Sequence, residues 1–439
     1  MSYKAYVTYV KNIRPAENAD RLNACEVFGN TTIIDKTITE DTLILYLPSD
    51  GQISVEFGEK NNLFRRKDEN GNNVGGFVDP DKRNIAAIRL RGNRSDGLVL
   101  PISCLNYCFS HGDASIEFHA GDVIDGPVNG HEIARKYIPK TNHRSGSVGN
   151  CGKVQKKKIK INLPYFTEHI DTPQLMYNMD MFKPGDLICL TEKVHGTSSR
   201  NANTLQISYK KNLFHKLFNL KGRKVEEYKY VAGTRRTVLE SATGGYYGTN
   251  EFRLEWANKF KDKLIPGECV FGEIAGFMAP GQPIMAKGDN KKTKDKNFIK
   301  SFGDTTVFSY GCNEEKGNSR YFIYRMTYTT PEGFVFEYPW DLVKLRAEQM
   351  GFEVVPELDR FIYTTEEDFL ARIEEWMDIP STIDSSHIIE GVVVRALNAP
   401  NSFRVAKNKS FNFRVIEGII KVNADAPDME EAQEIVDQG

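Results

Sequence analysis

The chain has 439 residues, too many for one ordinary hydrophobic core, so we expect two or three domains. Its 40% hydrophobic, 27% charged and 11% aromatic content is typical of a folded globular protein and argues against a disordered one. No apolar run reaches membrane-spanning length, and the N-terminus lacks the apolar stretch of a signal peptide. We therefore expect no membrane partner and a cytoplasmic location, which means the host cytoplasm if the source is a virus.

The net charge is only −1, but the charges are unevenly distributed: basic segments lie at 153–160, 210–224 and 287–300, and an acidic tail begins at residue 423. Attraction to phosphate is local, because it is screened beyond about 10 Å. A nearly neutral chain with such segments can therefore bind a polyanion along one face, although most charge runs are only solvated surface.

The seven cysteines are scattered and form no CxxC pair, which favours a reducing compartment over a disulfide framework. Cys104, Cys108 and His111 are close enough in sequence to suggest zinc. A structural zinc site needs four ligands, and no second ligand pair lies nearby. Two buried thiols are the better interpretation.

Short β-branched runs separated by turn signals fill the first ~125 residues, at 3–10, 24–28, 31–35, 42–48 and 85–92. They predict a small barrel or a partly open sheet in a domain spanning 1–140. The stretch 141–160 is rich in Gly, Ser, Asn and Lys and is typical of an exposed linker.

A mixed α and β pattern follows and predicts a second domain, 161–439. Expected strands lie at 186–194, 267–277, 305–312, 321–328 and 387–396. Helices are predicted at 251–264, 340–350 and 365–377, and the second of them ends at Gly351, a common stop signal.

The sequence contains no Walker A loop, no GxGxxG after a strand, and no HExxH or GxSxG motif. What stands out is Glu192-Lys193-Val194-His195-Gly196 at the end of an apolar strand. A lysine there emerges from the sheet edge, and the glycine lets the backbone approach a ligand closely. Lysine becomes a nucleophile when burial or a neighbouring cation lowers its pKa, although most strand-end lysines simply reach water.

Two acids, Glu273 and Glu390, lie inside otherwise apolar strands. A buried carboxylate needs a partner, a metal or a hydrogen-bonded ligand, so both are candidate site residues. Lys407 and Lys409 stand two apart and would face one side of a strand, where they can meet a phosphate.

In this order, the four elements resemble the covalent nucleotidyltransferase superfamily of ligases and mRNA capping enzymes. The resemblance implies that Lys193 is the adenylylated lysine. It implies that Glu273 contacts the ribose or a metal-bound water, and that Glu390 helps to hold the catalytic metal. Lys407 and Lys409 would hold the α-phosphate and orient the pyrophosphate.

The resemblance also implies an aromatic side chain that stacks on the purine, between the two acids. Phe322 is our first choice and Phe308 the second. An arginine near the AMP phosphate is expected at Arg235 rather than Arg236, and Arg200 is a further candidate for the phosphate or the acceptor strand. The implied nucleotide site also includes Glu192, Val194 and Gly196.

His195 in the KxHGT variant looks like the nick-sealing RNA ligases, whereas DNA ligases and capping enzymes usually have aspartate there. Those enzymes also carry an OB domain after the last lysine motif, and only about 30 residues follow Lys409, fewer than the ~50 of a small domain. Residues 12–29 instead resemble the opening of tRNA-binding-type OB modules. The implied fold is α+β, with a small N-terminal OB-like β-barrel before a mixed α/β nucleotidyltransferase (ATP-grasp-like ligase) domain built on antiparallel sheets.

The implied activity is an ATP-dependent RNA ligase that seals 3′-OH/5′-phosphate breaks through a Lys193–AMP intermediate, with Mg²⁺ (or Mn²⁺). The expected partner is RNA, as a nicked duplex, and no stable protein partner is inferred. Insertions at 210–228 and 287–300 are expected to contact the nucleic acid. The alternatives are a DNA ligase, a capping-type guanylyltransferase, or a nucleic-acid-binding relative without activity, and the intact set of lysines and acids argues against the last.

Overall fold

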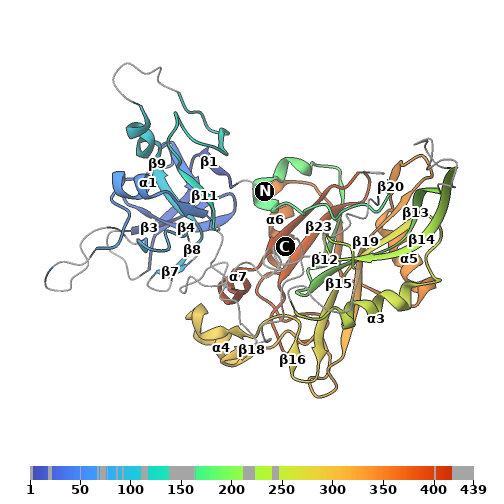
Figure 1. The fold of residues 1–439 in the computed structure, drawn as a ribbon. Coiled ribbons are helices and arrows are strands. Elements are labelled where there is room, and N and C mark those ends of the chain that lie inside the picture. The colour runs from blue at the N-terminus through green and yellow to red at the C-terminus, as the bar shows by residue number, and fades with distance from the viewer. Residues whose placement is uncertain are drawn as a thin grey trace, which may run out of the picture. The chain divides into compact units, whose positions relative to one another are not determined.

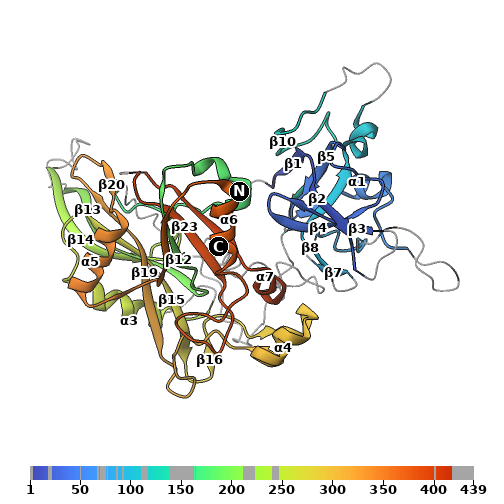
Figure 2. The same cartoon turned by 180° about the vertical axis from the view of Figure 1, so that it is seen from behind.

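The computed structural model (Figures 1 and 2) describes residues 3–17, 22–49, 51–66, 69, 76, 78–85, 88–90, 93–109, 117–137, 163, 165–210, 223–239, 247–399 and 402–417. The predicted linker 141–160, His111, most of the insertion 210–228 and the acidic tail lie outside these residues. Across the described ranges, no helix is both long and apolar enough to cross a membrane.

The described residues form two compact units. Of the described residues, one unit contains the N-terminal segment up to residue 137, Gly288–Thr306 and residues 410–417. The other contains the residues between 142 and 287 and between 307 and 409. The sequence prediction placed 288–306 and the residues after 409 in the second domain, whereas their contacts group them with the N-terminal segment.

In the first unit, small antiparallel sheets surround a core that includes Val7, Leu45, Leu47 and Phe57. The described strands form separate sheets rather than one closed barrel, so the OB-like barrel stays a prediction. The sheets are β10-β1-β5-β9 (Val123–Ile124, Ala5–Thr8, Ile44–Leu47, Leu98–Pro101), β2-β3-β4 (Lys11–Pro15, Leu22–Val27, Asn30–Asp35), β11-β6 (Ala134–Lys136, Gly51–Ile53) and β7-β8 (Ile88–Leu90, Asn93–Ser95).

Two short helical elements complete the N-terminal segment, α1 (Val55–Lys60) and η1 (Ile102–Cys108). Cys104 and Cys108 on η1 are both buried in the core. Burial raises the pKa of Cys104 to about 12 and also raises that of Cys108, so both stay neutral thiols. This environment agrees with the thiol interpretation of the pair.

The first unit also contains a lysine-rich segment and the last described helix. The segment consists of β17 (Gly288–Asp289), η4 (Asn290–Thr293), α4 (Lys296–Phe302) and β18 (Thr305–Thr306), and β17 pairs with β18. It packs on α7 (Phe411–Glu417): a Cβ added at Gly288 would lie 2.1 Å from Ile416 Cγ2.

The second unit is built on two sheets that are antiparallel except for the pairing of β19 with β21. This mixed α and β architecture on mostly antiparallel sheets confirms the coarse fold prediction. The seven-stranded sheet contains β14-β13-β15-β19-β20 (Arg223–Gly233, Thr197–Lys210, Glu268–Ala279, Ser319–Thr329, Val335–Glu337), with β16 (Gln282–Pro283) and β21 (Glu353–Val354) at its side. The four-stranded sheet is β22-β12-β23-β24 (Glu357–Ile362, Leu187–Glu192, Gly391–Ala396, Val405–Lys409).

Helices α3 (Glu251–Phe260), α5 (Trp340–Met350) and α6 (Glu366–Glu374) belong to the same unit, with the short turns η2 (Leu175–Tyr177) and η3 (Met179–Met181). The Thr365 side chain caps α6 by accepting from the Asp368 amide. Phe369 and Ile373 on α6 pack in one core with Ile188 of β12 and Val392 of β23, and both views show α6 beside β23. This packing fixes the two strands that carry the candidate site.

Some predicted elements differ from the structure. The predicted strand 305–312 is reduced to β18, because only Thr305 and Thr306 find a strand partner. The predicted strand 387–396 begins at Gly391, and the first helix ends at Phe260 rather than at residue 264.

Candidate active site

Lys193 follows the last residue of β12, an inner strand of its sheet. Its backbone N–H donates to the Gly391 carbonyl at 3.0 Å, on neighbouring β23. Residues 188–192 are all buried, which anchors β12 and leaves Lys193 just beyond the end of the strand. The side chain is 13% exposed, so it is largely withdrawn from water.

The Lys193 ammonium pairs with a fully buried carboxylate. Its Nζ lies 2.9 Å from Glu390 Oε1, and Lys409 Nζ lies 3.0 Å from the same oxygen. His195 Nδ1 lies 3.7 Å from the other oxygen, Oε2. A buried carboxylate is stable only with such partners, so this cluster explains how an apolar segment tolerates Glu390.

Two glycines permit this close arrangement. Gly391 has a φ of +152°, and a Cβ there would lie 2.1 Å from the Asn408 carbonyl oxygen. Gly196 lies where a Cβ would come within 2.3 Å of the Ile274 carbonyl. A side chain at residue 391 would push β23 away from β24, and a side chain at residue 196 would push the loop after Lys193 away from β15.

Glu273 reaches the site from β15. It pairs in register with Ser198 of β13, and Ser198 Oγ donates to Glu273 Oε2 at 3.3 Å. The side chain is only 6% exposed, yet it lines the pocket described next.

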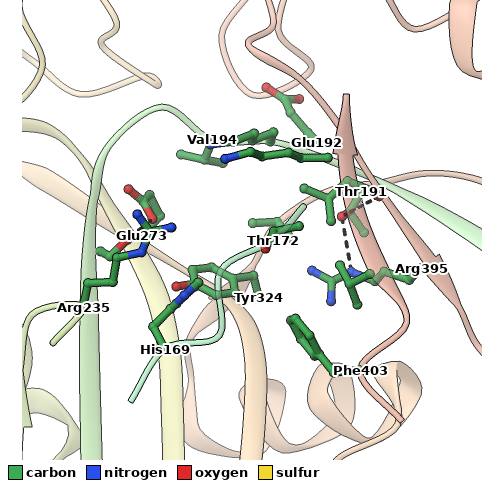
Figure 3. A pocket seen from close by; sticks show the side chains of 16 residues that line it. His169, Thr172, Thr191, Glu192, Val194, Arg235, Glu273, Tyr324, Arg395 and Phe403 are labelled. Atoms are coloured by element: carbon green, nitrogen blue, oxygen red, sulfur yellow. Dashed lines mark hydrogen bonds between the residues drawn. The ribbon is translucent and has the colours of Figure 1, made fainter. Parts of the chain in front are cut away.

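A pocket of about 620 Å³, counting the solvent at its mouth, lies between the two sheets of this unit (Figure 3). Figure 3 shows Glu273 and Arg235 on one side, Arg395 on the other, and Tyr324 between them. The lining residues are His169, Thr172, Thr191, Glu192, Lys193, Val194, Ser198, Arg235, Glu273, Tyr324, Val355, Val393, Arg395, Phe403, Val405 and Lys407.

The two predicted phosphate lysines are divided between two places on β24. Lys407 lines the pocket, pairs in register with Val393, and is fixed by its N–H, which donates to the Pro173 carbonyl at 2.8 Å. Lys409 is only 4% exposed and lies on Glu390 instead. The pocket wall thus contains Lys407 as well as Lys193, whereas Lys409 lies on the Glu390 carboxylate that Lys193 also contacts.

Of the predicted arginines, Arg235 lines the pocket, and its Nη2 lies 3.3 Å from Asp171 Oδ1. Arg236 pairs with the same carboxylate, at 3.1 Å, and is not among the lining residues. Arg200 is buried away from the pocket and donates to the carbonyls of Thr234 and Thr167, both at 2.6 Å. Burial lowers the pKa of Arg200, and its contacts tie backbone segments together.

Tyr324 is an aromatic side chain that lines the pocket together with Phe403, and it is the one that lies on β19, where the sequence placed the stacking residue. The β15–β19 pairing skips it, because Phe271 pairs with Arg325 and Gly272 pairs with Ile323. Such a bulge re-aims a side chain, and burial raises the pKa of the Tyr324 phenol, which therefore stays neutral. The predicted Phe322 is 2% exposed and does not line the pocket.

The second predicted aromatic, Phe308, packs on the lysine motif instead. Its ring lies 4.7 Å from that of His195, whose backbone N–H donates to the Tyr310 hydroxyl at 2.6 Å. Phe308 is 3% exposed and does not line the pocket. Its contact supports the loop after Lys193.

Of the other motif residues, Val194 lines the pocket, and the Glu192 side chain is held by the segment after α6. Its carboxylate accepts from the Thr382 amide at 2.9 Å and from the hydroxyls of Ser381 and Thr382. Glu192 therefore braces the end of β12 against this segment.

Sequence reasoning missed several lining residues, including His169, Thr172, Arg395 and Phe403. Arg395 had a detectable signal, since it interrupts the apolar strand β23 as Glu390 interrupts the residues before it. Burial lowers the pKa of Arg395 to about 10. His169 and Thr172 lie in an irregular segment that carries no pattern.

Neither the protein-family models nor the curated proteins include a match to this sequence. Solved structures do match it. A glutamate-to-alanine variant of Naegleria gruberi RNA ligase with ATP and Mn has a TM-score of 0.53 and 16% identity, over 93% of this chain and 97% of that one. A lysine-to-alanine variant with ATP and Mn has a TM-score of 0.51 and 15% identity, over 92% and 96%.

An apo variant of the same ligase gives a TM-score of 0.51 and 17% identity, over 94% of this chain and 98% of that one. At such identities the similarity concerns the fold. The chain therefore has the fold of Naegleria gruberi RNA ligase over nearly its whole length, as the order of its motifs predicts.

Proposed function

We propose that this chain is an ATP-dependent RNA ligase that carries AMP on Lys193. The observation that carries the proposal is the position of Lys193 Nζ, on a pocket wall and 2.9 Å from the buried Glu390 carboxylate. The shared fold supports it, because several of the matching RNA ligase structures contain ATP, AMP or PPi.

In the first step, Lys193 Nζ attacks the ATP α-phosphorus. The Lys193 ammonium first loses one proton to solvent, because only the free amine has a lone pair. A nitrogen–phosphorus bond then forms as the bond from phosphorus to the pyrophosphate oxygen breaks, and the second Nζ proton leaves with the pyrophosphate. Glu390 stays ionised beside Nζ. Lys407 in the pocket wall and Lys409 behind Lys193 offset the phosphate charge. Positioning and charge neutralisation supply most of the catalysis in such transfers.

The predicted metal ligands, Glu273 and Glu390, fit a divalent ion by their chemistry. Mg²⁺ and Mn²⁺ prefer carboxylate oxygens, and Glu273 offers one at the pocket wall while Glu390 lies against Lys193. A bound ion would neutralise phosphate charge and disfavour the protonated form of Lys193. Tyr324 replaces Phe322 as the proposed stacking side chain on the base, and Arg235 remains the proposed phosphate arginine.

In the later steps, AMP passes from Lys193 to the 5′-phosphate of a nicked RNA duplex, and the 3′-hydroxyl then displaces it. We propose 1–140, 141–160 and 161–439 as the functional regions in chain order: an OB-like domain that holds the nucleic acid, a linker, and the nucleotidyltransferase region. Within the last region, Gly288–Thr306 and the described residues that begin at Ser410 pack with the first unit.

The test is covalent labelling with α-labelled ATP and Mg²⁺, followed by a denaturing gel. Label is expected on the wild type and on Lys183→Ala, a control that removes an exposed lysine, and not on Lys193→Ala. Equal label on Lys193→Ala would refute the lysine assignment. Label from GTP alone would indicate a capping-type enzyme, and no label from either nucleotide on AMP-free protein would refute the proposal.

A further inference from the structure

The segment Gly288–Thr306 carries five exposed lysines on a rigid scaffold. Asn290, near the start of the segment, is fully buried and donates to the carbonyls of Gly303 at 2.9 Å and Phe302 at 3.4 Å. Thr306 Oγ1 donates to Asn290 Oδ1 at 2.9 Å. These bonds join the start and the end of the segment, so the lysines project from a fixed support.

The three acids of the segment are already engaged. Asp289 caps η4 by accepting from the Lys291 amide at 3.1 Å. Asp295 caps α4: its carboxylate accepts from the backbone amides of Asn297 and Phe298, both at 3.1 Å. The Asp304 carboxylate pairs with Lys291 Nζ at 2.9 Å. Each acid thus has a structural role within the segment.

Four ammonium groups are therefore left without a carboxylate. In the part of the chain that the structure describes, none lies within 4.0 Å of Lys292, Lys294, Lys296 or Lys300, and all four side chains are exposed. We call these four residues the lysine platform. Lys296 and Lys300 are four positions apart on α4, which places them on one helix face about 6 Å apart along the axis.

We propose that the lysine platform binds the phosphate backbone of the RNA substrate. This inference rests on the proposed ligase function, because it names a surface that holds the same substrate. Each strand of a duplex carries one charge per ~3.4 Å of axis, so two lysines ~6 Å apart span about two phosphates. Lysine acts as a point charge, so the platform positions RNA of any sequence.

The test is equilibrium binding of a fluorescent nicked RNA duplex to the full chain over a range of KCl concentrations. In the variant Lys292→Gln/Lys296→Gln/Lys300→Gln, affinity near 0.1 M salt should fall at least about tenfold. The slope of log K against log salt should become shallower by roughly 2–3, because each lost phosphate contact removes about 0.9. The triple Lys→Arg variant should bind like the wild type.

A matched control, Lys183→Gln/Lys261→Gln/Lys316→Gln, removes the same charge from exposed lysines elsewhere and should keep the wild-type slope. An unchanged slope in the platform variant, or an equal loss in the control, would overturn the inference. Covalent labelling with ATP should be normal in both variants. Failure of the wild type to label would count against the ligase proposal. The salt dependence of RNA binding by the platform variant tests the lysine platform independently of labelling.

Discussion

Gly391 determines how closely β23 approaches β24 and the backbone of Lys193 in the candidate site. Its φ of +152° is a backbone conformation that residues with a side chain rarely adopt. Its partner in register on β24 is Lys409. Its carbonyl also accepts from the Lys193 amide. One glycine thus sets the positions of two of the lysines in the site.

We expect Gly391→Ala to lower the free energy of unfolding by about 1–3 kcal/mol, from backbone strain and the clash with Asn408. Covalent labelling should fall with it, because the Lys193 and Lys409 positions depend on this contact. Denaturant unfolding and the labelling gel measure the two effects. The control is Gly126→Ala, where a Cβ meets nothing within 4 Å. Equal stability of both variants would contradict the expectation.

Tyr324 and Phe322 are predicted to affect different measurements. Tyr324→Ala should raise the KM for ATP in labelling by about 5–150-fold, since base stacking contributes ~1–3 kcal/mol. Phe322→Leu should lower the stability and change KM little, because Phe322 is buried outside the pocket. A raised KM for ATP in Phe322→Leu, with an unchanged KM in Tyr324→Ala, would indicate that Phe322 stacks on the base.

The residues that sequence could identify are those whose chemistry conflicts with their surroundings. Glu273 and Glu390 stand in apolar runs, and Lys193 ends one, so each was visible in the sequence. Tyr324 was not, because an aromatic strand offers several equal candidates. The bulge that selects one arises from pairing with β15, which no local pattern encodes.

At the scale of elements, the segment 307–312 shows why one strand prediction failed. Its residues have high β-propensity, yet the chain is held there by turns and by Asp384. The Asp384 carboxylate accepts from Ser309 Oγ and from the Gly311 amide, the latter at 2.9 Å. Propensity describes one residue at a time, whereas strand formation needs a partner. By contrast, the C-terminal end of α5 was predictable, because Gly351 adopts the left-handed conformation that stops a helix.

Asp384 is predicted to make stability depend on pH. Burial opposes its ionisation, but hydrogen bonds from Ser309, Ser386 and Gly311 hold its pKa below the usual value. A lowered folded-state pKa stabilises the fold above the unfolded pKa of about 3.9, and this stabilisation is lost as the pH falls through the folded value. Asp384→Asn should therefore cost most near neutral pH, with the difference from wild type shrinking in acid.

Unfolding by denaturant at neutral and acid pH measures this difference. The control is Asp180→Asn, which changes an exposed carboxylate on η3 and should show no such dependence. A cost of Asp384→Asn that stays constant with pH would contradict the assignment. The same variant should weaken labelling, because Tyr310, which contacts the His195 amide, lies in the segment that Asp384 holds.

At the scale of the whole molecule, the chain divides into two compact units, and every lining residue of the pocket belongs to one of them. The sequence indicated more than one domain. It could not show that two later segments join the N-terminal one, because such contacts depend on tertiary packing rather than on order along the chain.

ATP with Mg²⁺ should therefore raise the unfolding temperature of one unit only. A ligand at 100 times its Kd adds about 2.7 kcal/mol to the unit that binds it. Calorimetry of the full chain should show two transitions, of which one moves with ATP while the other stays. Movement of both transitions by the same amount, or a single transition, would contradict the separation.

The pairing of β12 with β23 has a consequence for how the protein is made. Thr191 and Val393 meet across 202 positions, and Lys409 joins Glu390 only when β24 has paired with β23. During synthesis Lys193, the proposed nucleophile, is therefore made long before Glu390 and Lys409, and contacts at such separations form late and slowly. A chain cut short before β24 would carry Lys193 and Glu390 without Lys407 and Lys409. Under the proposed function, covalent labelling should therefore require a chain that includes β24 and has paired it with β23.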